Sequence, residues 1–379
     1  MNFTRRSFCA LSGVAAASVL GLGLAGCGGQ APQAQTKDDG AADEASQDYL
    51  TQGKGEHLVC GVTGKLIKIA PAIVADKLGY FEEEGCDVEF QQIALNDAMT
   101  ALTSNQLDMD LFGVVPACTY VSQGAKAYIF GGTILNGSEI CALDSFDREL
   151  KAAEDFKGLR IGVNRPETGQ MVFKEWLQEE GLDIDGGDVT FTYFDNDQGG
   201  FEAVKKGEFD LYIANNAQGF VQRGNGIKVV ATVKQYAGDY PCCRQNCSDQ
   251  ALHEKYLSLV DFETALLRGY KTYKQEPDTV IPLLVDYSGQ EEGYVRAAMY
   301  GTDDYDNVMD PSPDPNRNAV LKFYDTLKNI GEIDKATVYS MDDYVVTSIY
   351  RTALDTLLER EPDEQLWKDL DQAYAKNNE

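Results

Sequence analysis

The sequence is poor in the residues on which most hydrolytic and transfer chemistry depends. It has two histidines in 379 residues, so few side chains titrate near neutral pH and could serve as general bases. It also lacks a Gly-x-x-x-x-Gly-Lys-Ser/Thr phosphate loop, a Gly-x-Ser-x-Gly turn and a His-Glu-x-x-His pair. These absences argue against the common nucleotide-driven, serine-dependent and zinc-dependent enzymes. We therefore expect no catalytic residues, no cofactor and no metal.

Basic charge is scarce as well. Lys and Arg number 33 against 61 Asp and Glu, which gives a formal net charge of −28. Nucleic acid is not expected as a partner, because phosphate binding needs a basic face. The acidic balance predicts a soluble surface. It leaves the charge of a bound small molecule open, because a cleft is governed by the groups that line it.

The chain has no apolar run of the ~20 residues that span a bilayer. A shorter run at residues 10–24 follows Arg5 and Arg6 and leads into Leu24-Ala25-Gly26-Cys27. This order predicts a cleaved signal peptide over residues 1–26 and a lipid on Cys27, and so an extracytoplasmic protein anchored to the cell membrane. The paired arginines favour the twin-arginine export route, and the general secretory route is the alternative.

Two features of the remaining chain set its domain organisation. Residues 27–55 are rich in Gly, Gln, Ala and acidic residues and predict a lipidated flexible linker. The last third shows apolar residues at three- and four-residue spacing, which predicts a helical segment that packs on a lobe already built. We expect lobe 1 at residues 56–145, lobe 2 at 146–238 and a return to lobe 1 at 239–379, with crossings near residues 143–151 and 233–239 that form a hinge.

The body of the chain repeats itself about a hundred residues apart. Leu58 to Val62 is echoed by Leu159 to Val163, and Asp87-Val88 is echoed by Asp188-Val189. Each copy has short apolar runs separated by helical patterns, an order that builds a mostly parallel α/β layer. Two such lobes leave a cleft between them, and ligands of open α/β sheets bind beyond the carboxyl ends of the strands.

Several segments of the body resemble the substrate-binding proteins of ABC importers, in the group that binds nitrate, sulfonates, taurine and thiamine pyrimidines. The segments that carry this resemblance are Lys77 to Gly85, Gln106 to Asp108 leading to Pro116, Phe156 to Val163, and Lys206 to Asp210. The resemblance implies a two-lobe clamshell of the periplasmic-binding-protein type II. Such a protein closes on a small organic molecule or oxyanion, of the sulfonate, nitrate or pyrimidine class. It then delivers the solute, as a monomer, to an ABC permease and its ATPase.

Within that fold the ligand-binding groups come from loops at strand ends. The corresponding positions here are Thr63, Gly64, Lys65, Asn96, Asp97, Val115, Pro116, Asn136, Gly137, Ser138, Glu167, Thr168, Gly169, Asp197, Asn215, Asn216, Cys242, Cys243 and Arg244. Thr168-Gly169 at a helix start offers free amides to an anion, and equally fits a helix cap. Lys65 and Arg244 either pair with an acidic ligand or are solvated. Asn215-Asn216 departs from the Glu-Pro pattern of the family, so a nitrate or sulfonate site does not transfer directly.

Seven of the nine cysteines lie beyond Cys27. Four of them fall on expected core strands or helices and are interpreted as small hydrophobes: Cys60, Cys86, Cys118 and Cys141. The other three cluster on an expected loop: Cys242, Cys243 and Cys247. For this cluster a packing role, a disulfide or reactive thiol, and a metal site all remain open, although a metal would need further ligands.

The cysteine pair also suggests a rival function, because some members of the related pyrimidine-synthesis branch carry a cysteine-rich motif. The alternative to a receptor is therefore an enzyme of that kind, or a ligand-sensing lipoprotein, on the same fold. The export signal and the absence of a longer run of cysteines favour the receptor.

Overall fold

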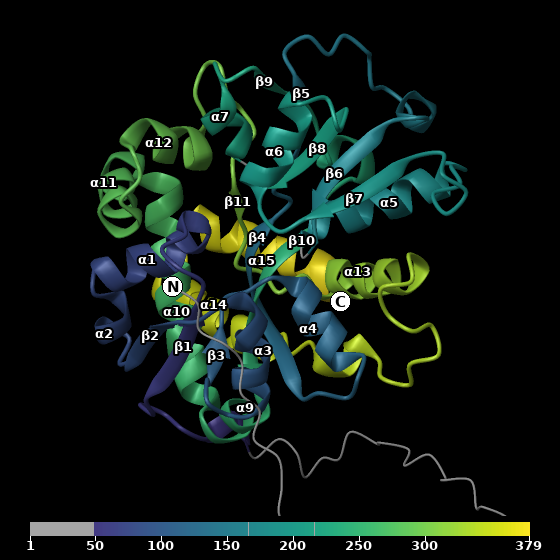
Figure 1. Cartoon of the computed structure of the whole chain (residues 1–379). Helices are drawn as coiled ribbons and strands as arrows, with labels where there is room; N and C mark the ends of the chain where they lie inside the picture. The colour runs from purple at the N-terminus through teal and green to yellow at the C-terminus, as the bar shows by residue number, and fades with distance from the viewer. Residues whose placement is uncertain (1–48, 166, 216) are drawn as a thin grey trace, which may run out of the picture. The chain divides into compact units, whose positions relative to one another are not determined.

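The computed structural model describes residues 49–379 except 166 and 216, together with all side chains in that range except that of Asn96. It confirms an α/β fold with two sheets, each flanked by helices (Figure 1). The expected signal peptide at 1–26, the expected lipidation site Cys27, most of the linker and the candidate ligand residue Asn216 lie outside the described residues. No helix of the described part is long and apolar enough to cross a membrane.

The sheet of lobe 1 has six strands in the order β11-β4-β10-β3-β1-β2. Its strands are β1 (Leu58–Val62), β2 (Val88–Gln92), β3 (Met109–Asp110), β4 (Ala127–Leu135), β10 (Pro241–Ser248) and β11 (Asp310–Pro311). The strand β1 pairs in parallel with β2 and β3, whereas β10 runs antiparallel to both β3 and β4.

The sheet of lobe 2 has five strands in the order β7-β6-β8-β5-β9. Its strands are β5 (Ser138–Leu143), β6 (Arg160–Asn164), β7 (Thr190–Phe194), β8 (Leu211–Asn215) and β9 (Ile227–Thr232). The strand β6 pairs in parallel with β7 and β8, and β5 runs antiparallel to β8 and β9.

The internal repeat corresponds to the parallel part of each sheet, β2-β1-β3 in lobe 1 and β7-β6-β8 in lobe 2. The remaining strands are antiparallel, so both sheets are mixed where mostly parallel sheets were expected. The path of the chain explains the difference. The strand β4 carries the chain out of lobe 1 and β10 brings it back alongside, and two adjacent strands traversed in opposite directions must be antiparallel.

The first crossing between the lobes comes earlier than the expected boundary at 145/146. Residues 136–137 connect β4 to β5, and β5 already belongs to the sheet of lobe 2. The apolar run of β5 matched the pattern of a lobe 1 strand, because pattern alone does not show which sheet a strand joins. The chain returns at residues 238–240, between the helix α8 (Lys234–Ala237) and β10.

The helices of lobe 2 are α5 (Thr168–Glu179), α6 (Asp197–Lys205), α7 (Gln218–Gln222) and α8. Those that precede the return of the chain in lobe 1 are α1 (Ala70–Lys77), α2 (Tyr80–Glu83), α3 (Leu95–Thr103) and α4 (Val114–Val121). The helices that follow β10 are α9 (Asp249–Glu254), α10 (Tyr256–Gln275), α11 (Pro277–Ser288), α12 (Glu292–Tyr300), α13 (Arg317–Asn329), α14 (Ser348–Arg360) and α15 (Gln365–Asn378). Short 3-10 turns lie at residues 49–51 and at η2 (Ile67–Ile69), η3 (Ala153–Phe156) and η4 (Met341–Tyr344).

The long helix α10 is the centre of lobe 1. Most of its residues are buried, and it packs against α1, α2, α11 and α14. It approaches α1 most closely at Gly269, where a Cβ atom would lie 2.1 Å from the carbonyl oxygen of Pro71. A glycine is therefore required for the contact between the two helices.

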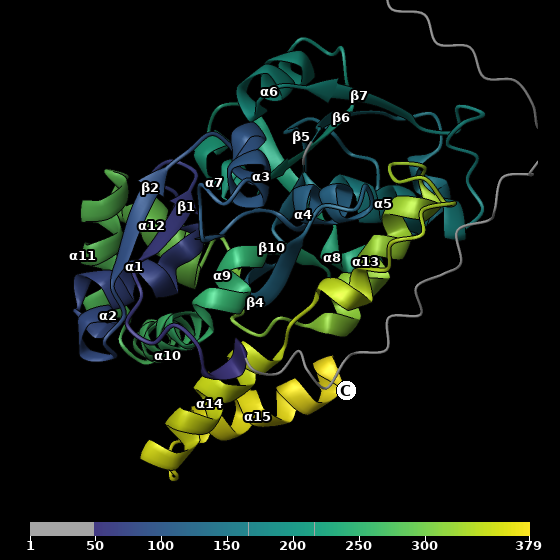
Figure 2. The same ribbon diagram turned by 90° about the horizontal axis from the view of Figure 1, so that it is seen from below.

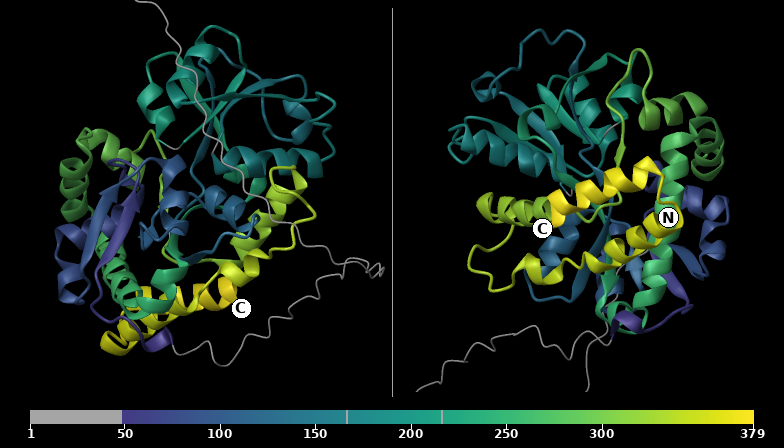
Figure 3. Two further views of the ribbon diagram at one scale, coloured as in Figure 1. Left: turned by 60° about the horizontal axis from the view of Figure 1, so that its bottom comes forward. Right: turned by 180° about the vertical axis from the view of Figure 1, so that it is seen from behind.

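The C-terminal helices cover lobe 1, as expected, and also reach lobe 2. Figure 2 shows α14 beside α10 and α15 beside α14, and the contacts agree. The helix α13 lies against both α15 and α5, so it bridges the lobes (Figure 3). One apolar cluster accordingly runs from α4 through Phe323 and Leu327 of α13 to Phe173 of α5.

Candidate functional site

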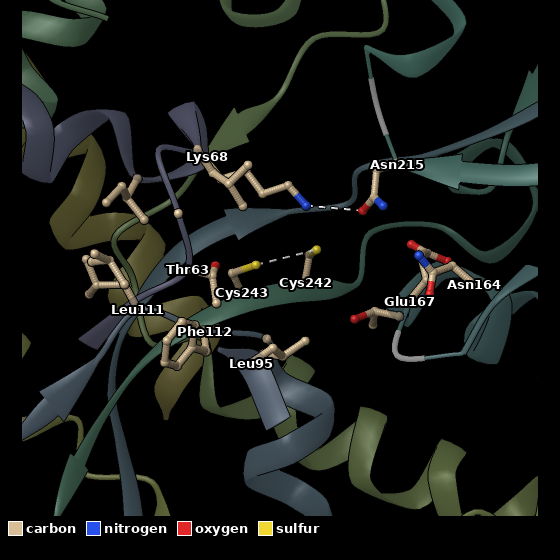
Figure 4. A pocket seen from close by; sticks show the side chains of 16 residues that line it. Thr63, Lys68, Leu95, Leu111, Phe112, Asn164, Glu167, Asn215, Cys242 and Cys243 are labelled. Carbon is tan, nitrogen blue, oxygen red and sulfur yellow. Dashed lines mark hydrogen bonds between the residues drawn. The ribbon is translucent and has the colours of Figure 1, made fainter. Parts of the chain in front are cut away.

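A cavity of about 210 Å³ lies between the two lobes (Figure 4). Lobe 1 lines it with the end of β1, the turn that follows it, η2, the first residue of α3, the segment between β3 and α4, and the start of β10. Lobe 2 lines it with the ends of β6 and β8 and the start of α5. Its walls are formed by Val62, Thr63, Gly64, Leu66, Lys68, Ile69, Leu95, Leu111, Phe112, Gly113, Asn164, Glu167, Thr168, Asn215, Cys242 and Cys243. The site lies at the carboxyl ends of the parallel strands, where ligands of such sheets bind.

The turn after β1 positions the one ammonium group among the described residues that line the cavity. Gly64 adopts a φ of +58°, a left-handed conformation that glycine adopts without strain, and the chain then enters η2. This geometry points Lys68 into the cavity and leaves Lys65 exposed outside it. The base that faces the site is therefore Lys68 and not the expected Lys65.

Lys68 connects the two lobes across the cavity. Its Nζ donates a hydrogen bond to Oδ1 of Asn215, at 3.1 Å, and Asn215 in turn donates to Asp197 at 3.4 Å (Figure 4). Burial by itself would lower the pKa of Lys68, but the negative potential of Cys243, Cys242, Glu167 and Asp197 outweighs it and the pKa is raised. The ammonium group is therefore charged at neutral pH and available to an anionic ligand.

The N-terminus of α5 is capped from within the protein. Glu167 precedes the helix, and its carboxylate accepts hydrogen bonds from the amides of Gly169, at 3.0 Å, and Gln170, at 2.8 Å. It also accepts a short hydrogen bond from Ser138 Oγ. Burial raises the pKa of Glu167 to about 7, against the lowering effect of these hydrogen bonds. Of the amides proposed for an anion at Thr168-Gly169, that of Gly169 is thus occupied by Glu167.

Cys242 and Cys243 are neighbours in sequence and both line the cavity. Adjacent side chains of a regular strand point to opposite faces, but β10 has irregular register between Pro241 and Cys243 and between Cys243 and Arg244. The two Sγ atoms lie 3.8 Å apart, within hydrogen-bonding range for sulfur. The cysteine cluster expected on a loop is therefore part of the strand β10. The sequence did not predict this strand because it contains the polar residues Arg244, Gln245 and Asn246, although all three are fully buried.

The rest of the cavity is apolar on the side of lobe 1. Phe112 and several aliphatic side chains form this wall: Val62, Leu66, Ile69, Leu95 and Leu111. Asn164, Thr168 and Asn215 face it from lobe 2. An apolar wall opposite amide and hydroxyl groups, with one ammonium group, suits a small organic molecule that carries an acidic group.

Seven of the residues selected from the sequence line the cavity: Thr63, Gly64, Glu167, Thr168, Asn215, Cys242 and Cys243. Five others lie away from it: Lys65, Asp97, Val115, Pro116 and Gly169. Val115 and Pro116 belong to the first turn of α4, one turn beyond the lining residues Phe112 and Gly113. Gly169 packs beneath Ser138, since a Cβ there would lie 2.0 Å from Ser138 Oγ. The side chain of Asn96 is not described.

Asn136 and Gly137 form the first crossing, Ser138 begins β5, and none of the three is part of the cavity wall. Asn136 has a φ of +59° and exchanges hydrogen bonds with Tyr240 of the second crossing. Its backbone N–H donates to the carbonyl oxygen of Tyr240 at 2.9 Å, and its side-chain Oδ1 accepts from the backbone N–H of Tyr240 at 3.2 Å. Ser138 Oγ accepts from Tyr240 Oη at 2.8 Å. These hydrogen bonds hold the two crossings together.

Asp197 and Arg244 support the site from behind. Asp197 accepts hydrogen bonds from Tyr212, at 3.0 Å, and from Asn215. Arg244 is fully buried next to the thiol pair, and its Nη1 donates to the carbonyl oxygen of Cys243 at 2.8 Å. Burial lowers the pKa of Arg244 to about 10, which leaves it charged at neutral pH. Both charges thus orient lining residues without lining the cavity themselves.

Sequence reasoning missed nine lining residues: Val62, Leu66, Lys68, Ile69, Leu95, Leu111, Phe112, Gly113 and Asn164. Asn164 ends β6 and corresponds to Thr63 in the first copy of the repeat, so the repeat itself carried a signal for it. The apolar residues gave none, because side chains of a cavity wall and of the core have the same composition.

A family model described as NMT1/THI5 like matches residues 67–280. The chain is also 25% identical over 286 residues to YtlA of Bacillus subtilis (strain 168), a candidate binding protein by name, with 72% of this chain and 82% of YtlA covered. The family match contains β10 and both crossings, and so most of the elements that build the cavity.

Solved structures share the fold at low sequence identity. The periplasmic nitrate-binding protein NrtA from Synechocystis PCC 6803 has a TM-score of 0.64 at 14% identity, with 79% of this chain and 89% of NrtA covered. The periplasmic aliphatic sulphonate binding protein SsuA from Escherichia coli has a TM-score of 0.62 at 13% identity, with 76% and 91% covered. The desulfurization enzyme DSZB has a TM-score of 0.58 at 14% identity, with 79% and 99% covered. The fold thus occurs in binding proteins and in an enzyme.

Proposed function

The chain belongs to the NMT1/THI5-like family, and from that premise we propose that it is a solute-binding receptor of an ABC importer. The observation that carries the proposal is the cavity that both lobes line, with a hydrogen bond from Lys68 to Asn215 across it. Contacts that form only when the lobes are together favour a closed state, and a solute that adds such contacts shifts the equilibrium further towards it.

The lining favours a small organic anion as the solute. Lys68 supplies a positive charge at one point of a wall that is otherwise apolar on the lobe 1 side. A ligand with an apolar body and one acidic group, as in an organic sulfonate, meets both features. Bare nitrate would leave the apolar wall unfilled, and a neutral pyrimidine would leave Lys68 without an anionic partner.

The proposed receptor acts outside the cytoplasm. The arginine pair, the apolar run and Cys27 support export by the twin-arginine route and a lipid anchor. An anchored receptor, acting as a monomer, would present the closed lobes to an ABC permease and its ATPase in the same membrane. The nitrate- and sulphonate-binding proteins that share its fold are both described as periplasmic.

The second candidate function is an enzyme on the same fold. The thiol pair in the cavity wall supports it, and the likeness to the desulfurization enzyme DSZB shows that the fold accommodates catalysis. Incubation with a bound solute separates the two candidates, because a receptor returns the solute unchanged whereas an enzyme returns a product of different mass.

A thermal-shift screen of residues 49–379 tests the receptor. We expect an organic sulfonate or carboxylate to raise the melting temperature in a dose-dependent way, since a ligand stabilises the state that it binds. Lys68→Gln should weaken the binding of that ligand roughly ten- to a hundredfold, because a hydrogen bond to a charged group contributes about 1.5–3 kcal/mol.

Lys65→Gln is the matched control for this screen. It removes the same charge three residues earlier, from an exposed side chain outside the cavity. The ligand affinity of this variant should stay at the wild-type value. If no compound shifts the melting temperature, or if both variants lose affinity equally, the proposed site is wrong.

A further inference from the structure

Two thiols in the wall of a ligand cavity are held in a position to react with each other. The irregular register of β10 turns Cys242 and Cys243 to the same side, with their Sγ atoms 3.8 Å apart. Figure 4 shows both side chains between the groups of lobe 1 and lobe 2. A small molecule that enters the cavity therefore meets both thiols.

The surroundings of the pair distinguish it from the other cysteines of the described residues. The thiol of Cys242 donates a hydrogen bond to Cys243 that lowers the pKa of Cys243 to about 7. The positive charges of Lys68 and Arg244 also lower this pKa, whereas burial and the charge of Glu167 raise it. Burial raises the pKa of Cys86 and Cys118 to about 12, and Cys60, Cys141 and Cys247 are likewise buried with raised pKa. Cys243 is thus the one described cysteine that is substantially a thiolate near neutral pH, and the thiolate is the nucleophile.

We propose that Cys242 and Cys243 form a redox-active dithiol that reduces a low-molecular-weight disulfide entering the cavity. The location rests on the proposed function, since it requires a cleft that admits small molecules. The chemistry does not depend on which solute the receptor carries.

The reaction proceeds in two balanced steps. The Cys243 thiolate attacks one sulfur of the small disulfide, a bond forms between the two sulfurs, and the other half leaves as a thiolate that takes up a proton. Cys242 then loses its proton and attacks Sγ of Cys243, which releases the second small thiol. The two cysteines are oxidised to a disulfide and the small disulfide is reduced to two thiols.

The product is easily reversed. The Cα atoms of adjacent residues lie about 3.8 Å apart across a trans peptide, whereas ordinary disulfides span about 4.4–6.8 Å. A disulfide between neighbours is therefore strained, and strained disulfides are readily reduced, so oxidation of the pair requires the small disulfide in excess over the thiol that it yields. The pair would cycle between two states and not act as a permanent crosslink.

Intact-mass spectrometry of the folded protein with bis(2-hydroxyethyl) disulfide tests the proposal. The wild type should lose two hydrogens and keep no adduct, with the crosslink mapped to residues 242–243 and reversed by dithiothreitol. Cys242→Ser should instead keep one hydroxyethylthio group on Cys243, because no thiol is left to displace it. Cys243→Ser should show at least a tenfold slower reaction.

The opposite results would overturn the proposal. These are an unreactive wild type, a stable adduct on wild type and Cys242→Ser alike, or equal oxidation of Cys243→Ser. Peptide mapping of the wild type alone supplies the same answer if a variant does not fold. The readout is independent of the thermal-shift screen, so a failed receptor and a failed dithiol are distinguishable.

Discussion

At the scale of single residues, burial of a carboxyl group has a consequence for stability. Asp110 is fully buried at the end of β3, and its Oδ1 accepts a hydrogen bond from Asn246 at 2.6 Å. Burial raises the pKa of Asp110 to about 7 in spite of that hydrogen bond and one from the amide of Phe112. The native protein therefore holds a proton that the unfolded chain, with a carboxyl pKa near ~3.9, releases.

We expect Asp110→Asn to weaken the pH dependence of stability. A raised native pKa contributes stability that is present below about pH 4 and lost as the pH rises through about 7. Asn cannot ionise, so between pH 4 and 8 the free energy of unfolding of the variant should rise relative to that of the wild type, by an amount on the order of a few kcal/mol.

Urea unfolding at several pH values measures the effect of Asp110→Asn. Asp363→Asn, at an exposed position, is the control and should follow the wild-type curve. Parallel curves for Asp110→Asn and wild type would contradict the assigned cause.

The sequence predicted ligand contacts from the turn after β1, which lines the cavity, but selected Lys65 where the structure turns Lys68 towards the cavity. Lys65 and Lys68 are three residues apart and chemically identical, so only the direction of each side chain decides which faces the cavity. That direction follows from the φ of Gly64 and the 3-10 turn η2, neither of which a residue pattern specifies.

At the scale of elements, the contact between α1 and α10 depends on one missing side chain. Alanine is favoured over glycine within a helix by about 1 kcal/mol. Gly269→Ala should nevertheless destabilise the protein, by about 1–3 kcal/mol, because its Cβ would lie 2.1 Å from the backbone of Pro71 and the helices would have to separate.

Gly293→Ala is the matched control for Gly269→Ala. Gly293 lies in α12 with no atom within 4 Å of the position of a Cβ, so this substitution should stabilise by about 0.5–1 kcal/mol. Denaturant midpoints of the two variants should move in opposite directions. A stabilised Gly269→Ala would mean that α1 and α10 adjust freely.

The elements predicted best from the sequence are those with a regular pattern. The strands β1 and β6 stand out through the repeat, and α1 through Pro71 in its first turn. The strand β10 was missed, because Arg244, Gln245 and Asn246 give it a polar sequence although they are fully buried. Their burial depends on partners such as Asp110 of β3 and Gly132 of β4, which are distant in the sequence.

At the scale of the whole molecule, the lobes are joined at several places with different strength. On the hinge side, Glu139 of β5 accepts hydrogen bonds from Asn307, at 2.9 Å, and Tyr305 of the segment after α12. The apolar contact of α13 with α5 adds to this connection. Across the cavity, the hydrogen bond from Lys68 to Asn215 is the one hydrogen bond between described lining residues of the two lobes. The cavity side should therefore open first.

We expect Asn215→Ala to shift the ligand-free protein towards an open arrangement. The variant loses the acceptor of Lys68 while the hinge contacts remain. Small-angle X-ray scattering should report a larger radius of gyration than for the wild type, and ligand should reduce the difference. Asn225→Ala, at an exposed position of lobe 2, should leave the scattering curve unchanged. Equal curves for all three proteins would show that Asn215 does not hold the lobes together.

Lobe 2 is one continuous stretch of chain, whereas lobe 1 is assembled from both sides of it, with β10 lying between β3 and β4 in the sheet. On a ribosome, therefore, the second lobe emerges complete while the first still lacks its central strand. The interval from Leu135 to Pro241 is about a hundred residues, or roughly 5–20 s at about 5–20 residues per second. During that time the nascent chain exposes the facing edges of β3 and β4, so chaperone protection during synthesis matters more for the earlier half of this protein than for the later one.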